Sequence, residues 1–531
     1  MKVLKELKLS EMSVKQKLGF VNVALYHSRC SEENEAFLFA QIRDRALGAI
    51  WIQQGSTPEE EAEVDRRIAK VREVADYPIL IMTDAESGMG DYKIGRHNPL
   101  ACTGDEAYAY AFGKAVGVTA RRRGYNMVCN PLLDIEENGS NRVFGPDKEK
   151  VARFAAAEAG GMHDAGVLTV GKHYPSPKND GNVDSHMVES VSRQTKEELI
   201  EDSLYPYRAL MKEGLLDGVM VAHALLGNID SELPASLSAP VKNVIRELGF
   251  EGVIVSDALC MMGVRAKHGR VKPMGMALES GCDLPMMFDD KLAFNQNSLY
   301  ECYEQGIISD EKLDAAVTRI LAAQHKALAY EKRGEVSLTE EEERLARGVE
   351  LAAVCEKRDE GCSAALSADG KHFFALMVDN GVALQSDKVE VDTFSSKWYN
   401  HVEIEKKLKE AFPASRVVPF YEHPNQSQCW ALLNASLDYD DVVFVTYSEF
   451  LAYTGAEHFT HRVISVAEAM QYTGKISTVL HFGNPMVLEE LPHIPRVIMA
   501  GASREGIAAG LAVLSGEKEA RGVMTYPVRL K

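Results

Sequence analysis

The sequence predicts an α/β protein in which a (β/α)8 TIM-type barrel is followed by a smaller α/β sandwich. Eight short apolar runs, several of them rich in Val and Ile without alternation, have the composition of strands buried on both faces. Eight β/α repeats in roughly 300 residues favour a barrel over a doubly wound open sheet. The runs are Leu18–Leu25, Gly48–Ile52, Ile79–Thr83, Tyr125–Asn130, Val167–Gly171, Gly218–Ala222, Gly252–Ser256 and Asp283–Phe288.

The helices between these runs carry start and stop signals. Thr57 is placed as an N-cap before Pro58, and proline suits the first helical turn. Gly124 and Gly166 follow helix ends, where a residue of positive φ is favoured. The expected helices are Glu32–Leu47, Pro58–Ala75, Glu106–Arg123, Lys148–Ala165, Lys196–Lys212 and Pro240–Leu248.

A second unit is expected after the barrel, which we assign to residues 1–330. Residues 331–360 are charged, with the run Thr339–Arg344, and are typical of a solvated linker helix. Residues 361–531 alternate apolar runs with helical stretches, which predicts a smaller α/β sandwich. The apolar runs are Phe373–Val378, Val417–Phe420, Val442–Thr446, Ile476–Phe482 and Val497–Ala500.

Composition narrows the partners and the compartment. The formal net charge of −19 argues against nucleic acid or an anionic membrane as a partner, because both require basic surface. No apolar stretch reaches the ~18 residues of a membrane span, and the charged start lacks the apolar core of a signal peptide. The nine cysteines stand without C-x-x-C pairs, as thiols of a reducing cytoplasm do. We expect a cytoplasmic protein of undetermined oligomeric state.

Polar side chains stand at the carboxyl ends of five of the predicted strands or directly after them. They are Thr83–Asp84, Asn130, Lys172–His173, His223 and Ser256–Asp257. Barrel enzymes keep their active sites at the carboxyl ends of the strands. We therefore expect these residues to meet on one face.

The segment Gly171–His186 concentrates charged and titratable groups in a loop rich in Pro, Gly and Asn, which makes an enzyme the first hypothesis. Asp184 and His186 are two residues apart, so in an extended segment their side chains point the same way. The carboxylate could orient the imidazole for proton transfer. The alternative is that Asp184 and His186 are an incidental D-x-H sequence in a surface loop.

Further candidates lie at the same strand ends. Asp257 directly follows a Val/Ile strand and is a nucleophile, a metal ligand or the cap of the next helix. Lys172 at the mouth of a buried strand requires a ligand or a carboxylate partner. Asp84 and Arg142 are either a cap and an ion pair or groups that hold the hydroxyls of a polar substrate.

Several motifs around these residues resemble a known family. The barrel motifs are NPLLDI (Asn130–Ile135), NRVFGPD (Asn141–Asp147), GKHYP (Gly171–Pro175), DSH (Asp184–His186), VMVAH (Val219–His223) and ELGFEGVIVSDAL (Glu247–Leu259). In order and spacing they resemble glycoside hydrolase family 3, in particular its β-N-acetylhexosaminidase (β-N-acetylglucosaminidase) branch. His481–Leu488 and Gly522–Val528 are similar to parts of the α/β sandwich in longer members.

The resemblance implies a retaining exo-β-glycosidase that removes a terminal N-acetylated amino sugar from an oligosaccharide or glycoconjugate, such as cell-wall or chitin fragments. Asp257 is then the nucleophile that forms a covalent glycosyl–enzyme, and His186, paired with Asp184, is the acid/base. No metal and no organic cofactor are implied. The residues implied to bind the sugar hydroxyls are Asp84, Arg142, Lys172 and His173.

The chain departs from the family pattern around the sugar. The family reads K-H-F-P-G-H-G-D-T before D-S-H, whereas Ser176–Val183 differs from it and Lys172–His186 is one residue longer. Met89 stands where the family has a sugar-holding Arg, and Ala258 replaces the second residue of an Asp-Asp pair. These changes bear on the choice of sugar more than on the reaction.

Other functions fit the same residues. A phosphorylase on the same scaffold is compatible with a neutral His acid/base, which does not repel phosphate. A metal-dependent hydrolase would use His173, His186 and His223 with an Asp. A sugar-binding protein without catalysis is compatible with the altered loop.

Overall fold

The computed structural model describes residues 4–137, 139–178, 188–289, 291–378, 385–386, 389–390, 399–421, 423–439, 441–448 and 458–530. The chain forms two compact units whose segments interleave along the sequence, unlike the uninterrupted ranges 1–330 and 361–531 that we predicted. The first unit comprises Met1–Tyr92, Ala109–Ile135 and Asp147–Ala346, and the second comprises Lys93–Tyr108, Glu136–Pro146 and Arg347–Lys531.

The first unit is built on a curled parallel sheet whose strands pair in the order in which they occur in the chain. They are entirely buried or nearly so, as apolar strands covered on both faces must be. The described residues give seven strands: β1 (Val23–Leu25), β2 (Ala49–Trp51), β3 (Leu80–Thr83), β6 (Met127–Val128), β7 (Leu168–Tyr174), β9 (Gly218–Val221) and β11 (Val253–Ser256).

The eighth predicted strand, Asp283–Phe288, forms an isolated parallel bridge in the described structure, between Leu284 and Val255 of β11. The end of this segment lies near the start of the sheet, because the Phe288 ring packs edge-on against Trp51 of β2 at 5.6 Å between centroids. The sheet thus curls back on itself. The predicted barrel-type α/β architecture is confirmed.

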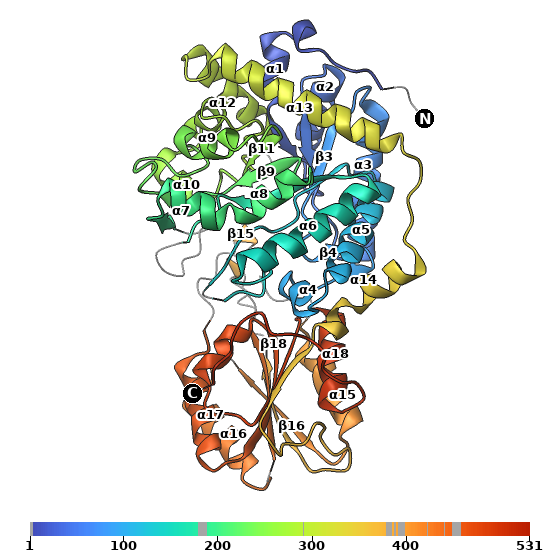
Figure 1. Cartoon of the computed structure of the whole chain (residues 1–531), viewed down its shortest axis with the longest axis vertical. Helices are drawn as coiled ribbons and strands as arrows, with labels where there is room; N and C mark the ends of the chain where they lie inside the picture. Colours follow the sequence, from blue (N-terminus) through green and yellow to red (C-terminus); the bar gives the residue numbers. More distant parts are fainter. Residues whose placement is uncertain are drawn as a thin grey trace. The chain divides into compact units, whose positions relative to one another are not determined.

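Helices cover the outside of this sheet (Figure 1). Side-chain caps fix their starts: the Thr57 hydroxyl accepts from the Glu60 N–H in a capping box, and Asp147 caps two N–H groups. The helices are α1 (Val14–Phe20), α2 (Glu32–Arg43), α3 (Pro58–Val74), α5 (Glu106–Arg123), α6 (Lys148–Ala165), α7 (Lys196–Glu198), α8 (Tyr205–Lys212), α9 (Ala239–Glu247), α10 (Met262–His268), α11 (Lys272–Glu279), α12 (Leu292–Glu304), α13 (Asp310–Glu331) and α14 (Glu340–Ala352).

One predicted strand and one predicted helix differ from the structure in the type of element that forms. The first predicted strand run begins as helix, because Leu18–Phe20 belongs to α1. The single helix expected over Lys196–Lys212 is interrupted by a π-helical turn at Leu199–Ser203. Pro206 explains why a new helix starts there, since proline has no N–H to continue the earlier hydrogen-bond pattern.

The second unit is a sheet between two helical layers (Figure 1). Five parallel strands and one antiparallel edge strand pair in the order β12–β19–β18–β17–β13–β16 among the described residues. The strands are β12 (Cys355–Arg358), β13 (Phe373–Val378), β16 (Arg416–Tyr421), β17 (Val442–Ser448), β18 (Ile476–Gly483) and β19 (Arg496–Ala500). The helices are α4 (Asn98–Cys102), α15 (His401–Ala411), α16 (Gln426–Ser436), α17 (His461–Tyr472) and α18 (Arg504–Leu514).

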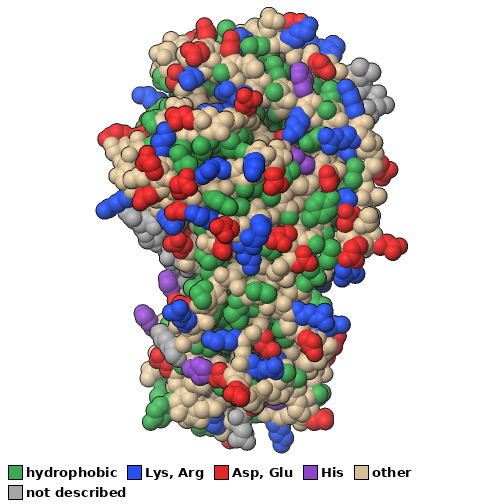
Figure 2. Space-filling model, in the orientation of Figure 1, with side chains coloured by type: hydrophobic (Ala, Val, Ile, Leu, Met, Phe, Trp, Pro, Cys, Tyr) green, Lys and Arg blue, Asp and Glu red, His purple; other side chains and the backbone are tan. Residues whose placement is uncertain are grey.

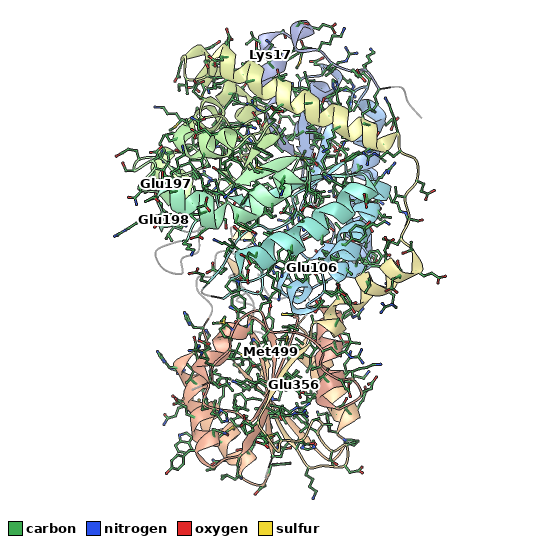
Figure 3. All side chains as sticks on the ribbon, in the orientation of Figure 1. Lys17, Glu106, Glu197, Glu198, Glu356 and Met499 are labelled. Atoms are coloured by element: carbon green, nitrogen blue, oxygen red, sulfur yellow. The ribbon has the colours of Figure 1, made fainter. Side chains whose placement is uncertain are left out.

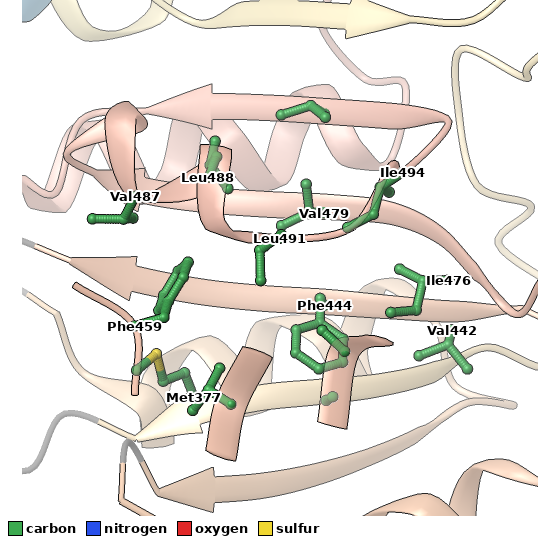
Figure 4. Close-up of a cluster of buried hydrophobic side chains, with 14 of the residues drawn as sticks. Met377, Val442, Phe444, Phe459, Ile476, Val479, Val487, Leu488, Leu491 and Ile494 are labelled. Carbon is green, nitrogen blue, oxygen red and sulfur yellow. The ribbon is translucent and has the colours of Figure 1, made fainter. Parts of the chain in front are cut away.

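Each face of this second sheet has its own apolar core. One cluster joins Phe444 and Val479 to the α16 and α17 side, and Figure 4 shows part of it around Leu491. The other cluster joins Phe374 and Leu480 to α15 and α18. Four of the five predicted strand runs therefore lie in strands buried on both faces, as their unbroken apolar composition requires. The fifth, Val417–Phe420 in the edge strand β16, is buried at Val417 and Phe420 and exposed at Pro419.

Three pairs of two-residue strands lie outside the two main sheets among the described residues. They are β4 (Gly88–Met89) with β5 (Tyr92–Lys93), β8 (Val191–Ser192) with β10 (Leu225–Leu226), and β14 (Gln385–Ser386) with β15 (Val389–Glu390). Acidic and basic side chains intermingle on the face shown in Figure 2. Among the helices of the described residues, none has both the length and the apolar character needed to cross a membrane.

A buried carboxylate holds the eighth segment to β11. Asp283 is 0% exposed, and its carboxylate pairs with Arg246 at 3.0 Å and Arg319 at 2.7 Å. It also accepts the backbone N–H of Ile254 at 2.8 Å. Burial raises the pKa of Asp283, and the two guanidinium groups oppose that rise by favouring the charged form.

We expect Asp283→Asn to destabilise the first unit by about 3–5 kcal/mol, because it leaves two half-buried guanidinium groups without their counterion. Chemical denaturation followed by circular dichroism measures the loss. Glu341→Gln, which removes an exposed pair with Arg344, should leave the unfolding midpoint unchanged. Equal effects of the two substitutions would contradict the buried-pair account.

Candidate active site

The ammonium group of Lys172 is the centre of the candidate site. The structure extends β7 to Tyr174, so Lys172 and His173 lie inside the strand instead of in a loop after it. Lys172 is 1% exposed, and its Nζ contacts Asp84 Oδ1 and, at 2.7 Å, Glu86 Oε1. A buried ammonium requires such partners, since its desolvation is costly.

Hydrogen bonds from neighbouring side chains hold the loop that supplies both carboxylates. Gln54 donates its side-chain N–H to the Asp84 carbonyl. The side chain of Asn130 accepts from the Ala85 N–H at 3.1 Å and donates to Glu158 at 2.8 Å. The residues that follow β3 are thereby tied to the chain that follows β6. This support fixes the positions of Asp84 and Glu86 relative to Lys172.

His173 has a carboxylate partner that orients its ring. Asp134 accepts from the His173 backbone N–H at 3.1 Å and lies 2.8 Å from ring Nδ1. A carboxylate at Nδ1 favours the tautomer that carries its proton there. The His173 imidazole is therefore held in one orientation at the end of β7.

Asp257 is the first residue after β11 and is partly exposed. Its backbone N–H donates to Val221 O at 2.9 Å, which ties it to the end of β9. Its Oδ1 accepts from the Ala258 N–H at 2.7 Å. These bonds hold the carboxylate at the carboxyl end of the sheet.

His223 supports this segment from behind. Its Nε2 lies 3.0 Å from Ala258 O, so that nitrogen donates, and Nδ1 then accepts from the Ser236 hydroxyl at 2.8 Å. Both ring nitrogens are engaged in holding the backbone next to Asp257. This arrangement does not fit the metal-ligand role considered for His223.

Asp257 and Lys172 lie on either side of the end of β9. Lys172 is the register partner of Met220 in β9, and Asp257 is bonded to Val221, the next residue of that strand. Burial raises the pKa of the Cys129 thiol, which follows β6, well above its usual range; the charges of Asp84, Asp257 and Glu86 add to the rise, and Lys172 opposes it. That these residues form one sugar-binding site stays a prediction.

Three predicted residues are not part of the described first unit. Asp184 and His186 lie outside the described residues. Arg142 belongs to the second unit, where its backbone N–H donates to the Ser140 hydroxyl at 3.1 Å. Their roles stay predictions.

The structure adds Glu86, Asp134 and Cys129 to the residues that the sequence singled out. Glu86 and Asp134 do stand in or next to the motifs, each a short step after an expected strand end. Their pairing with Lys172 and His173 joins segments far apart in sequence. No local pattern signals such a pairing.

The geometry agrees with what comparison with known proteins finds. The model of the family described as "Glycosyl hydrolase family 3 N terminal domain" matches residues 6–323. The chain therefore belongs to glycosyl hydrolase family 3 and is a glycoside hydrolase, as predicted. Among its curated relatives, a "Beta-hexosaminidase" of Tolumonas auensis is 30% identical over 46% of this chain and 76% of that protein.

A "Beta-N-acetylglucosaminidase/beta-glucosidase" of Cellulomonas fimi is 27% identical over 65% of this chain, which matches 64% of that relative's length. A solved family 3 β-N-acetylglucosaminidase from Paenibacillus sp. has a TM-score of 0.79 at 24% identity, covering 98% of this chain and 100% of that one. A structure of "Beta-glucoside phosphorylase BglX" has a TM-score of 0.78 at 20% identity, covering 97% and 94%. The relatives confirm the expected branch, and the structures confirm the two-part fold.

The support behind Asp257 includes a fully buried lysine. Lys242 is 1% exposed and donates to the carbonyls of Ala235 at 3.0 Å and Ser236 at 2.9 Å. Ser236 is the residue whose hydroxyl meets His223. Burial lowers the pKa of Lys242 to about 7.

This pKa makes the stability of the first unit depend on pH. At pH values between about 7 and 10.5, the ordinary pKa of lysine, Lys242 is protonated in the unfolded chain and has lost its proton in the folded chain. Stability therefore rises with pH across this window, by up to about 1.4 kcal/mol per pH unit. We expect Lys242→Met to flatten the rise in denaturation experiments at successive pH values. The exposed control Lys212→Met should keep the wild-type slope, and a K242M slope that equals it would refute the assignment.

Proposed function

We propose that this glycoside hydrolase is a retaining exo-β-N-acetylglucosaminidase, with Asp257 as nucleophile and His186 as acid/base. One observation carries the proposal: Asp257 after β11 is bonded to Val221 of β9, and Lys172, which pairs with Asp84 and Glu86, is the register partner of Met220 in the same strand. This arrangement supports a nucleophile close to groups able to hold sugar hydroxyls, at the strand ends where barrel enzymes act.

In the first step a carboxylate oxygen of Asp257 attacks the anomeric carbon. The new carbon–oxygen bond to Asp257 forms as the bond to the leaving group breaks, and His186 gives its proton to the departing oxygen. In the second step His186 removes a proton from water, which attacks the anomeric carbon and releases Asp257. Two inversions give overall retention. Asp184 would keep the His186 ring aligned.

The groups beside Asp257 suit a sugar ring. The Asp84 side chain keeps 34% of its surface exposed although it is paired with Lys172, so it can accept a hydrogen bond from a hydroxyl. His173, fixed through Asp134, can serve a second hydroxyl. Lys172 and Glu86, which are deeper, act by holding Asp84 in position. Arg142 is proposed as a further sugar ligand on the resemblance alone.

The N-acetyl preference rests on the relatives. Their printed names are β-hexosaminidase and β-N-acetylglucosaminidase/β-glucosidase. Met89, which replaces an Arg of the family pattern, is fully buried on β4 and cannot bond a hydroxyl.

Asp257→Ala should lower kcat by more than about 10³-fold, because no other group can form the glycosyl–enzyme. Hydrolysis of 4-nitrophenyl β-N-acetylglucosaminide measures this loss. The exposed control Asp65→Asn on α3 should retain wild-type kcat. In His186→Gly, which lacks the base for the second step, acid quenching during turnover should yield a sugar adduct on the Asp257 peptide by mass spectrometry. An Asp257→Ala enzyme that hydrolyses at the wild-type rate would remove the mechanism, whereas no hydrolysis by either the wild type or the variant would favour a binding protein.

Aryl β-glycosides of N-acetylglucosamine, N-acetylgalactosamine, glucose and xylose test the sugar. We expect the N-acetylglucosaminide to have the highest kcat/KM. Turnover of unsubstituted sugars alone would make the N-acetyl assignment wrong and leave the glycosidase intact. Parallel reactions with inorganic phosphate separate a phosphorylase, since only that enzyme accumulates a sugar 1-phosphate. We expect free sugar with and without phosphate.

A further inference from the structure

Four sulfur-containing residues line one cavity of the second unit. The cavity has a volume of about 40 Å³. Its lining includes Cys102, Cys355, Met499 and Met524. Cys and Met usually fill a core as plain apolar residues. Here they border a space that can hold a small occupant.

The sheet places two of these side chains next to each other. β12 runs antiparallel to β19, and Cys355 is the direct partner of Met499 in that register. Directly opposed residues of an antiparallel pair project from the same face with Cβ atoms about 4.5–5.5 Å apart. Figure 3 labels Met499 together with Glu356, the neighbour of Cys355 on β12.

The end of the chain brings the other two sulfur atoms to the same place. Cys102 ends α4, and its carbonyl accepts from the Val523 N–H at 2.7 Å. The preceding residue, Gly522, donates to Val354 O at 2.9 Å. Met524 therefore follows a segment that is bonded both to Cys102 and to the residue before Cys355. Gly522 permits this approach, because a Cβ there would lie 2.4 Å from the Ala353 carbonyl oxygen.

The donor set selects a class of metal ion. As described, the lining contains no Asp, Glu or His, so it lacks the carboxylates on which Mg²⁺ and Ca²⁺ sites usually depend. Thiolate and thioether sulfurs are soft ligands that favour monovalent copper. We infer that this cavity is a Cu(I) site formed by Cys102, Cys355, Met499 and Met524.

Charge balance supports this ion. Each thiol now donates a hydrogen bond at 3.3 Å, Cys102 to Asn98 Oδ1 and Cys355 to Ala353 O. Binding one Cu⁺ releases two protons and forms two copper–thiolate bonds, which leaves the group with a net charge of −1. Arg96 lines the same cavity, and a cationic residue at its border favours a buried anion.

The cavity also has a buried hydrogen-bond acceptor in its lining. Asn141 lines it and is only 4% exposed, and in the described part of the chain its Oδ1 has no hydrogen-bond partner. A buried acceptor without a donor is costly. A water molecule brought in with the metal ion would supply that donor.

The test uses the full chain with the partly exposed thiols removed, because they would bind copper themselves. The background variant carries Cys→Ser at positions 30, 260, 362 and 429. Under anaerobic conditions it is titrated into Cu(I) held by excess bicinchoninate, whose coloured complex reports copper loss. We expect one equivalent to move to the protein. Adding Cys102→Ser and Cys355→Ser should weaken binding by more than about 100-fold.

Two paired substitutions keep the test decisive if the cysteine variant fails to fold. Met499→Leu with Met524→Leu conserves volume and should weaken Cu(I) binding about tenfold or more while the fold is retained. Met377→Leu with Met470→Leu, in the same unit but outside the cavity lining, should bind like the background protein. Uptake of no copper against bicinchoninate, or equal uptake by all variants, would mean that the four sulfurs serve only as apolar packing.

Discussion

A single buried ammonium group organises the proposed active site. Lys172 cannot be desolvated at the end of β7 without anionic partners, and both partners come from the segment after β3. The strand between them in the sheet is β6. The need to neutralise one cation therefore links the ends of β3 and β7 across β6. The side chains proposed to bind the sugar are held in place by these pairs.

Several carboxylates stand at these strand ends. Asp84 and Glu86 pair with Lys172, and Asp257 follows β11, two strands further along the sheet. Glycoside cleavage passes through a transition state with positive charge on the sugar ring. Carboxylates that are fixed beforehand stabilise such charge without reorganising. In the proposed mechanism the carboxylates at these strand ends would have that role.

Unbroken apolar runs could be located from the sequence because burial on both faces leaves a plain signal: β13 lies at Phe373–Val378 as predicted. β12 was not predicted, because an edge strand needs little apolar character and Cys355–Arg358 is largely charged. Lys172 was expected to need a carboxylate or a ligand, and it has two carboxylates. Which ones, and the pairing of His173 with Asp134, depended on contacts between distant segments that no local pattern encodes. Local sequence likewise could not assign Arg142 to the second unit.

The interleaving of the two units has a consequence for biosynthesis. Lys93–Tyr108 and Glu136–Pro146 belong to the second unit, yet the ribosome makes them long before Arg347–Lys531, which completes that unit. Domains that are continuous in sequence fold in the order of their synthesis. In this chain the two stretches cannot complete their packing until Arg347–Lys531 has also been synthesised. The second unit therefore finishes folding only after the barrel segments on either side of those stretches have been made.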